Sequence, residues 1–323
     1  MTDNIISERG YVIIAVNPIE YRQAQCCAYS IKSKMPEASV TLVVGDEQKV
    51  QKKFLDGFDA ITELPFVSAT TRRQNDWQLY WASPYEYTIA IDCSTLVKTD
   101  QSSIWDYLID HHDIVFPNSI TNIRKAEIYP TYKKYFKTEY NLDIIYSSVF
   151  FFKKNETTLK HFKMADVYFQ YWKDVCGKYL RPEHMPDYFD PDIMHTLVAE
   201  HTYGEVLTIH NILSYIDMQN SVNTRLNKTS KWTDKFTVWP SNAGKIKIQN
   251  YAINDILYYH NDEFLTQEIP ISNILFFIKW VDNETISSDS PLFEIQITIS
   301  SLPITPISPC KASPRWRKID FDP

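Results

Sequence analysis

The sequence predicts an α/β fold with a parallel or mixed sheet that is covered by helices on both faces. Short, continuous apolar runs such as Tyr11–Val16 and Ser39–Val44 are typical of strands that are buried on both sides. Segments of helical length separate these runs, and the strands lack turn-linked neighbours. Strands that alternate with helices in this way form parallel or mixed sheets with helices packed on their faces.

The expected elements follow one another along the chain. The expected strands are 11–16, 39–44, 58–64, 88–91, 113–116 and 144–152. The expected helices are 19–34, 72–82, 157–175 and 190–200. Proline delimits the first of these elements, because Pro18 breaks the first strand, Pro36 follows the first helix and Pro84 stops the second.

Composition divides the chain near residue 268. Residues 1–268 are expected to form one domain, with an N-terminal tail at 1–9 and a polar, irregular region at 211–249 that suits a binding loop. Residues 269–323 are expected to be a C-terminal extension, partly irregular, because serine and proline concentrate at 287–314.

Bulk composition excludes several classes of protein. The chain has 323 residues, a net charge of −7 and only six glycines, and it contains no glycine-rich phosphate loop. A non-specific nucleic-acid coat protein would be basic. The five cysteines form no CxxC motif, which favours free thiols over a zinc site. No signal peptide and no apolar run of membrane-spanning length occur, so the sequence predicts a cytoplasmic protein without a membrane partner.

One apolar strand ends in a carboxylate that could bind a ligand. In Tyr87–Val97 the strand ends at Asp92, and Cys93, Ser94 and Thr95 follow it. Ligands of open α/β sheets bind at the carboxyl ends of strands, and hard oxygen ligands suit Mg²⁺ or Mn²⁺ on a diphosphate. An aspartate at a strand end is also an ordinary turn or cap residue, and the residues alone leave both interpretations open.

Three segments resemble the GT-A glycosyltransferase fold, a Rossmann-like mixed sheet, and within it glycosyltransferase family 8. Val12–Asn17 (VIIAVN) is similar to the opening strand that contacts uridine, and Trp77–Val97 to the helix and strand that lead into the family's DxD motif. Tyr146–Phe152 (YSSVFFF) resembles the strand that frames the sugar and acceptor. The resemblance covers about residues 10–265 and is nearest to tailed-phage versions, some of which glycosylate modified bases of phage DNA. It implies transfer of a sugar from a UDP-sugar donor to an acceptor hydroxyl.

By position, the resemblance implies a donor site at the ends of these segments. The implied donor-binding residues are Val16, Asn17, Tyr21, Arg72, Arg73, Gln78, Asp92, Cys93 and Ser94. Asp92 matches the first aspartate of DxD, whereas Ser94 stands where the second would be. A hydroxyl is a poorer ligand than a carboxylate, so three alternatives stay open: weakly held Mn²⁺ or Mg²⁺, another group in its place, or a metal-independent enzyme. Gln78 stands where related sequences often carry lysine, and Arg72 or Arg73 could supply the missing charge.

The resemblance also implies a metal ligand and a catalytic carboxylate. His260 sits where the family supplies a histidine to the metal bound by Asp92, although a surface histidine would give the same sequence. Asp192, with Asp190 as the neighbouring candidate, matches an acidic position near the reacting sugar. Asp190-Pro191 is also an ordinary helix start, so Asp190 is expected to cap the helix and Asp192 to face the site. The family implies retention at the anomeric carbon, but sequence spacing does not decide between retention and inversion.

Two basic, aromatic stretches are candidates for the acceptor side. Residues 122–138 carry five basic residues, one glutamate and four aromatic rings, and residues 231–247, in the acceptor-side loop region 211–249, interleave lysine with tryptophan. DNA and RNA binders use such residues for phosphate contacts and stacking, but a charged helix face over an aromatic core looks the same. The candidate acceptor residues are Ser147, Ser148, Lys133, Lys134, Lys231 and Trp232.

The favoured acceptor is hydroxymethylcytosine in phage DNA, with arabinose or glucose as the sugar. A base-modifying enzyme would have to extrude its target nucleotide into a pocket. Two alternatives remain: a transferase that acts on a glycan or protein, and a protein that binds nucleotide-sugars with weak or no catalysis. The oligomeric state is not predicted.

Overall fold

The computed structural model describes residues 7–66, 72–97, 99–121, 127, 131–142, 145–182, 185–186, 189–203, 213, 215–217, 238–240, 246–248, 251–253 and 256–258. Only the backbone is described for 131–135 and, after residue 202, for all but Leu213, Tyr215 and Ile256. All of these residues belong to the compact unit Met1–Thr285. The extension predicted at 269–323 lies outside the described residues.

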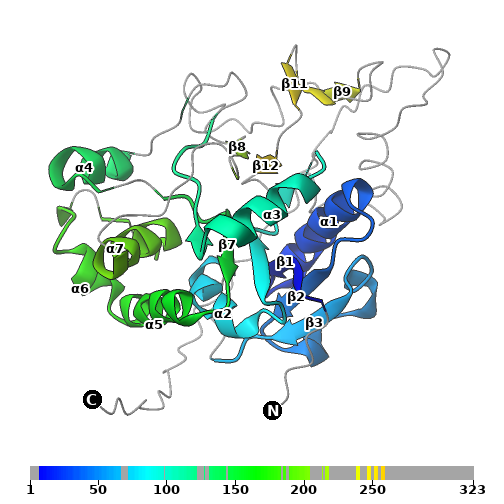
Figure 1. The fold of residues 1–323 in the computed structure, drawn as a ribbon, viewed down its shortest axis with the longest axis horizontal. Coiled ribbons are helices and arrows are strands. Elements are labelled where there is room, and N and C mark those ends of the chain that lie inside the picture. Colours follow the sequence, from blue (N-terminus) through cyan, green and yellow to red (C-terminus); the bar gives the residue numbers. More distant parts are fainter. Residues whose placement is uncertain are drawn as a thin grey trace, which may run out of the picture. The chain divides into compact units, whose positions relative to one another are not determined.

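A six-stranded mixed sheet forms the centre of this unit, in the strand order β3-β2-β1-β4-β7-β6 (Figure 1). The first four strands run parallel, and β7 runs antiparallel to both of its neighbours. The predicted α/β class with a mixed sheet is thereby confirmed. The strands are β1 (Arg9–Ile14), β2 (Val40–Val44), β3 (Ala60–Glu63), β4 (Tyr87–Ile91), β6 (Ile114–Val115) and β7 (Val149–Lys153).

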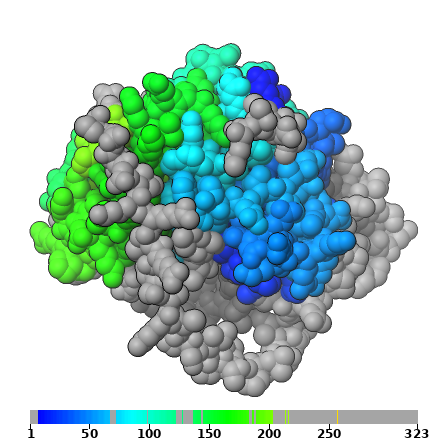
Figure 2. All heavy atoms as spheres, turned by 90° about the horizontal axis from the view of Figure 1, so that it is seen from below, coloured from blue at the N-terminus to red at the C-terminus, as the bar shows by residue number. Residues whose placement is uncertain are grey.

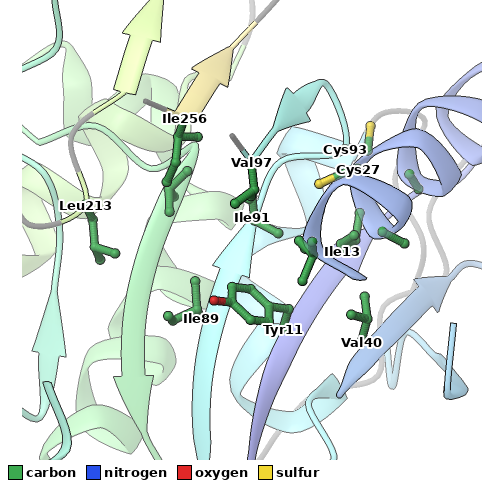
Figure 3. Packing of buried hydrophobic residues seen from close by; sticks show 14 of the residues in the cluster. Tyr11, Ile13, Cys27, Val40, Ile89, Ile91, Cys93, Val97, Leu213 and Ile256 are labelled. Atoms are coloured by element: carbon green, nitrogen blue, oxygen red, sulfur yellow. The ribbon is translucent and has the colours of Figure 1, made fainter. Parts of the chain in front are cut away.

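One face of the sheet is covered by α1 (Pro18–Lys34) and α3 (Ser102–His111). Alternate residues of a strand point to opposite faces, and Tyr11 and Ile13 of β1 point to this one. Figure 3 shows them gathered with Ile89 and Ile91 of β4 and with Cys27 of α1. The four cysteines that the structure describes are buried and are not joined by disulfide bonds.

The opposite face is covered by α2 (Leu79–Ala82) and α5 (Glu156–Gln170). Val12 and Ile14, the other set of β1 residues, belong to this core layer. The ring of Tyr80 in α2 packs against Phe162 of α5, with ring centroids 5.9 Å apart. On the face drawn in Figure 2, the blue and cyan N-terminal part of the chain adjoins the green part that includes α5. The prediction of helices on both faces is confirmed.

Two helix predictions differ from the structure in detail. The segment expected as one helix at 72–82 is mostly a 3-10 helix, η3 (Arg72–Gln78), followed by the single turn α2. Gln78 donates to Asn75 Oδ1 and accepts from the backbone N–H of Phe66, so it is buried and fixed at the point where η3 meets α2. The helix expected at 157–175 is split at Tyr171 (φ −117°, ψ 25°) into α5 and α6 (Trp172–Cys176).

Several short elements were not predicted, because they are too short to show a period or carry no capping signal. They are η1 (Glu47–Lys49), η2 (Lys52–Phe54), α3, α4 (Thr131–Tyr140), β5 (Thr95–Leu96), β8 (Tyr215–Asp217), β9 (Val238–Pro240), β10 (Ile246–Ile248), β11 (Tyr251–Ile253) and β12 (Ile256–Tyr258). Strands β8, β9 and β10 lie within the region 211–249 that was expected to be irregular. Strand β12 pairs with β5, so Tyr258 lies opposite Thr95, three residues after Asp92.

The reversed direction of β7 gathers the predicted site. Val149, its first residue, pairs with Ile91, the last residue of β4. The pairing continues for one more bond, from the N–H of Asp92 to the carbonyl of Ser148 at 2.7 Å. Ser147 and Ser148, which precede β7, therefore lie beside the carboxyl end of β4. Within the described ranges, no helix combines the length and apolarity that crossing a bilayer requires.

Candidate functional site

A cleft opens where β1 and β4 end and β7 begins. Its volume is about 340 Å³, including the part that is open to solvent. Side chains of the strands form an apolar base, among them Val12, Ala90 and Phe150. Its polar lining consists of Arg72, Arg73, Asp76, Asp92, Ser147 and Ser148. Ligands of open α/β sheets bind at such a position, at the carboxyl ends of parallel strands.

Asp92 is held by Arg72 from η3. Arg72 Nε lies 3.0 Å from both carboxylate oxygens of Asp92, and Nη2 lies 3.0 Å from Oδ1. Arg72 Nη2 also donates to Ser94 Oγ at 2.8 Å. Ser94 in turn donates twice to Asp92 Oδ1, from its hydroxyl at 2.6 Å and from its backbone N–H at 2.8 Å. Asp92, Arg72 and Ser94 thus form one closed hydrogen-bonded cluster, which we call the Asp92 cluster.

The electrostatics of the Asp92 cluster favour an ionised carboxylate. The side chains of Asp92 and Arg72 are only 8% and 17% exposed, so water screens their interaction weakly. Burial opposes ionisation of Asp92, but the charge and hydrogen bonds of Arg72, together with the Ser94 bond, hold the pKa of Asp92 below its usual value. The cluster therefore contains a buried ion pair at neutral pH.

The first turn of α1 is tied to the same arginine. Asn17 is the N-cap of α1, and its side chain accepts hydrogen bonds from the N–H groups of Ile19 and Glu20. Glu20 accepts from the Val16 N–H at 2.8 Å and lies 3.3 Å from Arg72 Nη1. Burial raises the pKa of Glu20, and the positive charge of Arg72 opposes that rise. The end of the VIIAVN segment thereby helps to position Arg72, a role for Glu20 that the sequence did not reveal.

A second carboxylate enters the cleft region from α7 (Pro191–Tyr203). Asp192 Oδ1 accepts hydrogen bonds from the backbone N–H and the hydroxyl of Ser147, at 2.8 and 2.7 Å. Arg73 Nη2 lies 4.0 Å from the same oxygen. Asp190 accepts from the Asp192 N–H at 2.9 Å, which is the geometry of a helix N-cap. The start of β7 thus fixes Asp192 on the side of the cleft lined by Arg73.

Asp76 is a cleft residue that sequence reasoning missed. It belongs to η3 and lines the cleft together with Arg72 and Arg73. Burial raises the pKa of Asp76 well above its usual value, and the negative charges of Asp92 and Asp192 add to that effect. A raised pKa favours the protonated form of a carboxyl group, which can donate a hydrogen bond. The sequence RRQNDWQ carried no motif that would mark this aspartate.

Three of the predicted donor residues are engaged in packing or in hydrogen bonds within the fold. Tyr21 is buried with its ring 5.9 Å from that of Phe54. Gln78 is buried and bonded to Asn75 and Phe66. Cys93 is buried and donates to Gln23 Oε1 at 3.2 Å, and burial raises the pKa of its thiol well above the usual value. None of the three lines the cleft.

Some predicted residues lie outside what the structure describes. His260, Lys231 and Trp232 are among them, and so are the side chains of Lys133 and Lys134 in α4. The predictions for the acceptor side and for the second metal ligand therefore remain predictions.

The residues of the Asp92 cluster do not fit a divalent cation. Both carboxylate oxygens of Asp92 accept hydrogen bonds from Arg72, and Ser94 contributes a hydroxyl where a second carboxylate would be expected. Mg²⁺ and Mn²⁺ require several unprotonated oxygen or nitrogen ligands that face the ion. Among the described residues, no group of three or more histidine, cysteine, aspartate or glutamate side chains is arranged to hold a metal.

Comparisons with known proteins give likenesses of structure only. No protein-family model and no curated protein sequence matches the chain. The galactosyltransferase LgtC, in complex with donor and acceptor sugar analogues, is 13% identical, with a TM-score of 0.48 over 83% of this chain and 95% of its own. Mouse xyloside xylosyltransferase 1 is 11% identical, with a TM-score of 0.43 over 66% and 88%.

A third structure has a different name and chemistry. The 4-diphosphocytidyl-2C-methyl-D-erythritol synthase of Anaerococcus prevotii is 11% identical, with a TM-score of 0.34 over 62% of this chain and 86% of its own. Likenesses at these scores do not decide an activity.

Proposed function

We propose that this chain is a glycosyltransferase that moves a sugar from a UDP-sugar to an acceptor hydroxyl. The observation that carries the proposal is the cleft itself, where Asp92, Arg72 and Arg73 meet at the carboxyl ends of parallel strands, with Asp192 4.0 Å from Arg73. Arginine and strand-end carboxylates are suited to a nucleotide with a diphosphate. The resemblance of three chain segments to GT-A glycosyltransferases supports the same assignment.

The reaction breaks one bond and forms one bond at the anomeric carbon of the sugar. The bond from this carbon to the diphosphate oxygen breaks, and UDP leaves with the electron pair. The acceptor oxygen forms the new glycosidic bond and loses its proton. Positive charge near the departing diphosphate stabilises the negative charge that develops there, and Arg73 and Arg72 are the cleft residues that supply it.

Asp192 is the residue that we assign to the reacting sugar. Ser147 holds one of its oxygens by two hydrogen bonds, which fixes the direction of the carboxylate. In an inverting reaction Asp192 would take the acceptor proton as a general base. In a retaining reaction it would support the positive charge that builds on the sugar ring, by analogy with glycoside hydrolysis. The resemblance to family 8 favours retention, and the anomeric configuration of the product distinguishes the two.

The acceptor is the finer part of the proposal. The basic, aromatic segment 122–138 favours DNA that contains hydroxymethylcytosine, with arabinose or glucose as the transferred sugar. A glycan or a protein hydroxyl is the alternative, because aromatic rings also stack on sugars. Measuring the release of UDP with DNA, glycan and protein acceptors, each beside a matched control without the modification, would identify the class of acceptor.

The proposed function is tested by incubating the protein with UDP-sugars and following sugar transfer and UDP release. Asp192→Asn should lower kcat by about 10²–10⁴-fold while UDP still binds, because the substitution keeps the shape and removes the charge. Asp106→Asn is the matched control, since that side chain is 83% exposed and pairs with Arg9 away from the cleft. If calorimetry detects no binding of UDP, the proposed function is contradicted.

One observation favours a second candidate, a protein that binds nucleotide-sugars without catalysis. The carboxylate of Asp92 is hydrogen-bonded to Arg72 and Ser94. Ser94 also stands where the family's motif has its second carboxylate, so the expected pair of carboxylates is absent. UDP-sugar binding without either transfer or hydrolysis, across all acceptors, would select this candidate.

A further inference from the structure

We propose that Arg72 takes the place of a divalent cation at Asp92, so that a nucleoside diphosphate binds this cleft without any metal. The inference rests on the proposed function, because it concerns how the UDP part of the donor is held. It selects one of the three alternatives that Ser94 left open.

Both carboxylate oxygens of Asp92 already accept hydrogen bonds within the protein. A metal ion would have to compete with these donors for the lone pairs of the carboxylate. Arg72 Nε is 3.0 Å from each oxygen, and Oδ1 also receives two hydrogen bonds from Ser94. A cation could enter only after Arg72 had left a cluster in which both charged side chains are more than 80% buried. Its departure would break its hydrogen bonds to Asp92 and Ser94 and would separate its charge from Glu20, which lies 3.3 Å from Arg72 Nη1.

The charges of the Asp92 cluster balance without a metal. Two carboxylates with a divalent cation form a neutral group. One carboxylate, one hydroxyl and one guanidinium, as in the Asp92 cluster, also form a neutral group, and the buried Glu20 lies 3.3 Å from the same guanidinium. The loss of a carboxylate at Ser94 and the presence of Arg72 are therefore matched changes. Ser94 belongs to this arrangement, because its hydroxyl accepts from Arg72 while donating to Asp92.

A second guanidinium, that of Arg73, lines the same cleft. Arg73 follows Arg72 in η3, and its side chain is 28% exposed. Its Nη2 forms an ion pair with Asp192 Oδ1 at 4.0 Å. Two neighbouring arginines offer a diphosphate the planar, charged donors that suit phosphate oxygens, and arginine stays protonated at any physiological pH. We assign the contact with the diphosphate to Arg73, with Arg72 as the fixed charge behind it.

Calorimetry with UDP in EDTA, and separately in Mn²⁺ or Mg²⁺, tests the inference. The dissociation constant should change by less than about threefold between these conditions, which is under 1 kcal/mol. Binding that is more than about tenfold weaker in EDTA would overturn the inference and leave the proposed function standing. No UDP binding under any condition would overturn both. Mn²⁺ paramagnetic resonance gives an independent readout, in which the protein should bind no Mn²⁺ at micromolar concentrations, with or without UDP.

Variants of the arginines sharpen the test. Arg73→Met should weaken UDP binding in EDTA by at least about tenfold, without loss of the fold, since Arg73 is partly exposed. Arg9→Met is the matched control, because Arg9 pairs with Asp106 outside the cleft. Arg72→Lys, which keeps the charge but loses the forked geometry, should also weaken binding, whether or not Mn²⁺ is added. UDP affinity in Arg73→Met equal to that of the unchanged protein, or a Mn²⁺ requirement in the unchanged protein, would overturn the inference.

Discussion

At the scale of single residues, Asp76 shows how a cleft can change the chemistry of a side chain. It carries the same carboxyl group as Asp92 and lines the same cleft, yet the two have opposite pKa shifts. Asp92 has Arg72 bound directly to it, so its charged form is stabilised. For Asp76, burial and the nearby negative charges outweigh the arginines, so its neutral form is stabilised.

Asp76→Asn should therefore make stability less dependent on pH. In the unfolded chain an aspartate has a pKa of about 3.9. The pKa of folded Asp76 is well above that value, so the folded protein keeps this proton to higher pH. The folded state thus holds more protons in that interval, and stability falls as pH rises through it. Asparagine cannot ionise, so the variant should gain melting temperature relative to the unchanged protein at pH 8 and much less at pH 4. An equal difference at both pH values would contradict the raised pKa. Asp106→Asn, at an exposed position, provides the control.

Sequence reasoning identified residues that stand in a recognisable pattern. Asp92 and Ser94 follow an apolar strand, and Asp192 follows an Asp-Pro helix start, so each could be singled out without a structure. Glu20 and Asp76 could not, because their roles come from contacts across the fold. Arg72 meets Glu20 across 52 positions of the sequence. The sequence also could not predict that Arg72 pairs with Asp92 rather than with a ligand.

At the scale of elements, β1 packs against the ring of Tyr85 through a glycine. A Cβ atom added at Gly10 would lie 2.4 to 2.7 Å from three carbon atoms of that ring. Tyr85 is fully buried, and its hydroxyl is 2.7 Å from Thr41 Oγ1 of β2, so the ring has little freedom to move. The absence of a side chain at Gly10 is thus what lets Tyr85 tie β1 to β2.

Gly10→Ala should destabilise the fold by about 1–3 kcal/mol, the usual effect of overpacking a core. The measurement is the free energy of unfolding in urea. In a Tyr85→Leu background the same substitution should cost less, because the ring that the new methyl group meets is gone. Equal costs in both backgrounds would show that the Gly10–Tyr85 contact is not the cause.

Strands that are buried on both sides were predicted well, because their sequences are continuous apolar runs. The runs at β1, β2 and β4 are buried almost throughout, so their positions were found within two residues. The 3-10 geometry of η3 was not foreseen, since apolar and polar residues alternate similarly in both kinds of helix. The direction of β7 was not foreseen either, because an apolar run carries no information on strand polarity.

At the scale of the whole described unit, stability should depend on a buried histidine pair between α5 and α7. His161 Nε2 and His195 Nδ1 are 2.9 Å apart, both side chains are fully buried, and their rings stack at 5.2 Å. Burial lowers the pKa of His195 to about 3 and that of His161 well below its usual value. Both rings are therefore neutral in the folded protein at physiological pH.

Acid should unfold the protein at a higher pH than protonation of its carboxylates alone would require. Below about pH 6.5 the unfolded chain takes up protons on these histidines, while the folded state does not. The free energy of unfolding therefore falls as pH falls, by up to about 1.4 kcal/mol per pH unit for each ring. Replacing both, as His161→Gln with His195→Gln, should flatten the loss of stability between pH 7 and pH 5 in urea unfolding. His111→Gln, at an exposed ring, is the matched control. An unchanged slope in the double variant would refute this account.

The antiparallel strand β7 has a consequence for how this protein could acquire a new specificity. Asp92 comes one residue after the last Cα pair between β4 and β7, and Ser147 and Ser148 come just before the first. These three polar residues of the cleft thus lie next to the paired residues of the sheet, whereas the apolar base of the cleft, which includes Ala90 and Phe150, is formed by paired residues. Natural variation could exchange the three polar side chains while the sheet keeps its register, so that the architecture is inherited and the chemistry at its end is free to diverge.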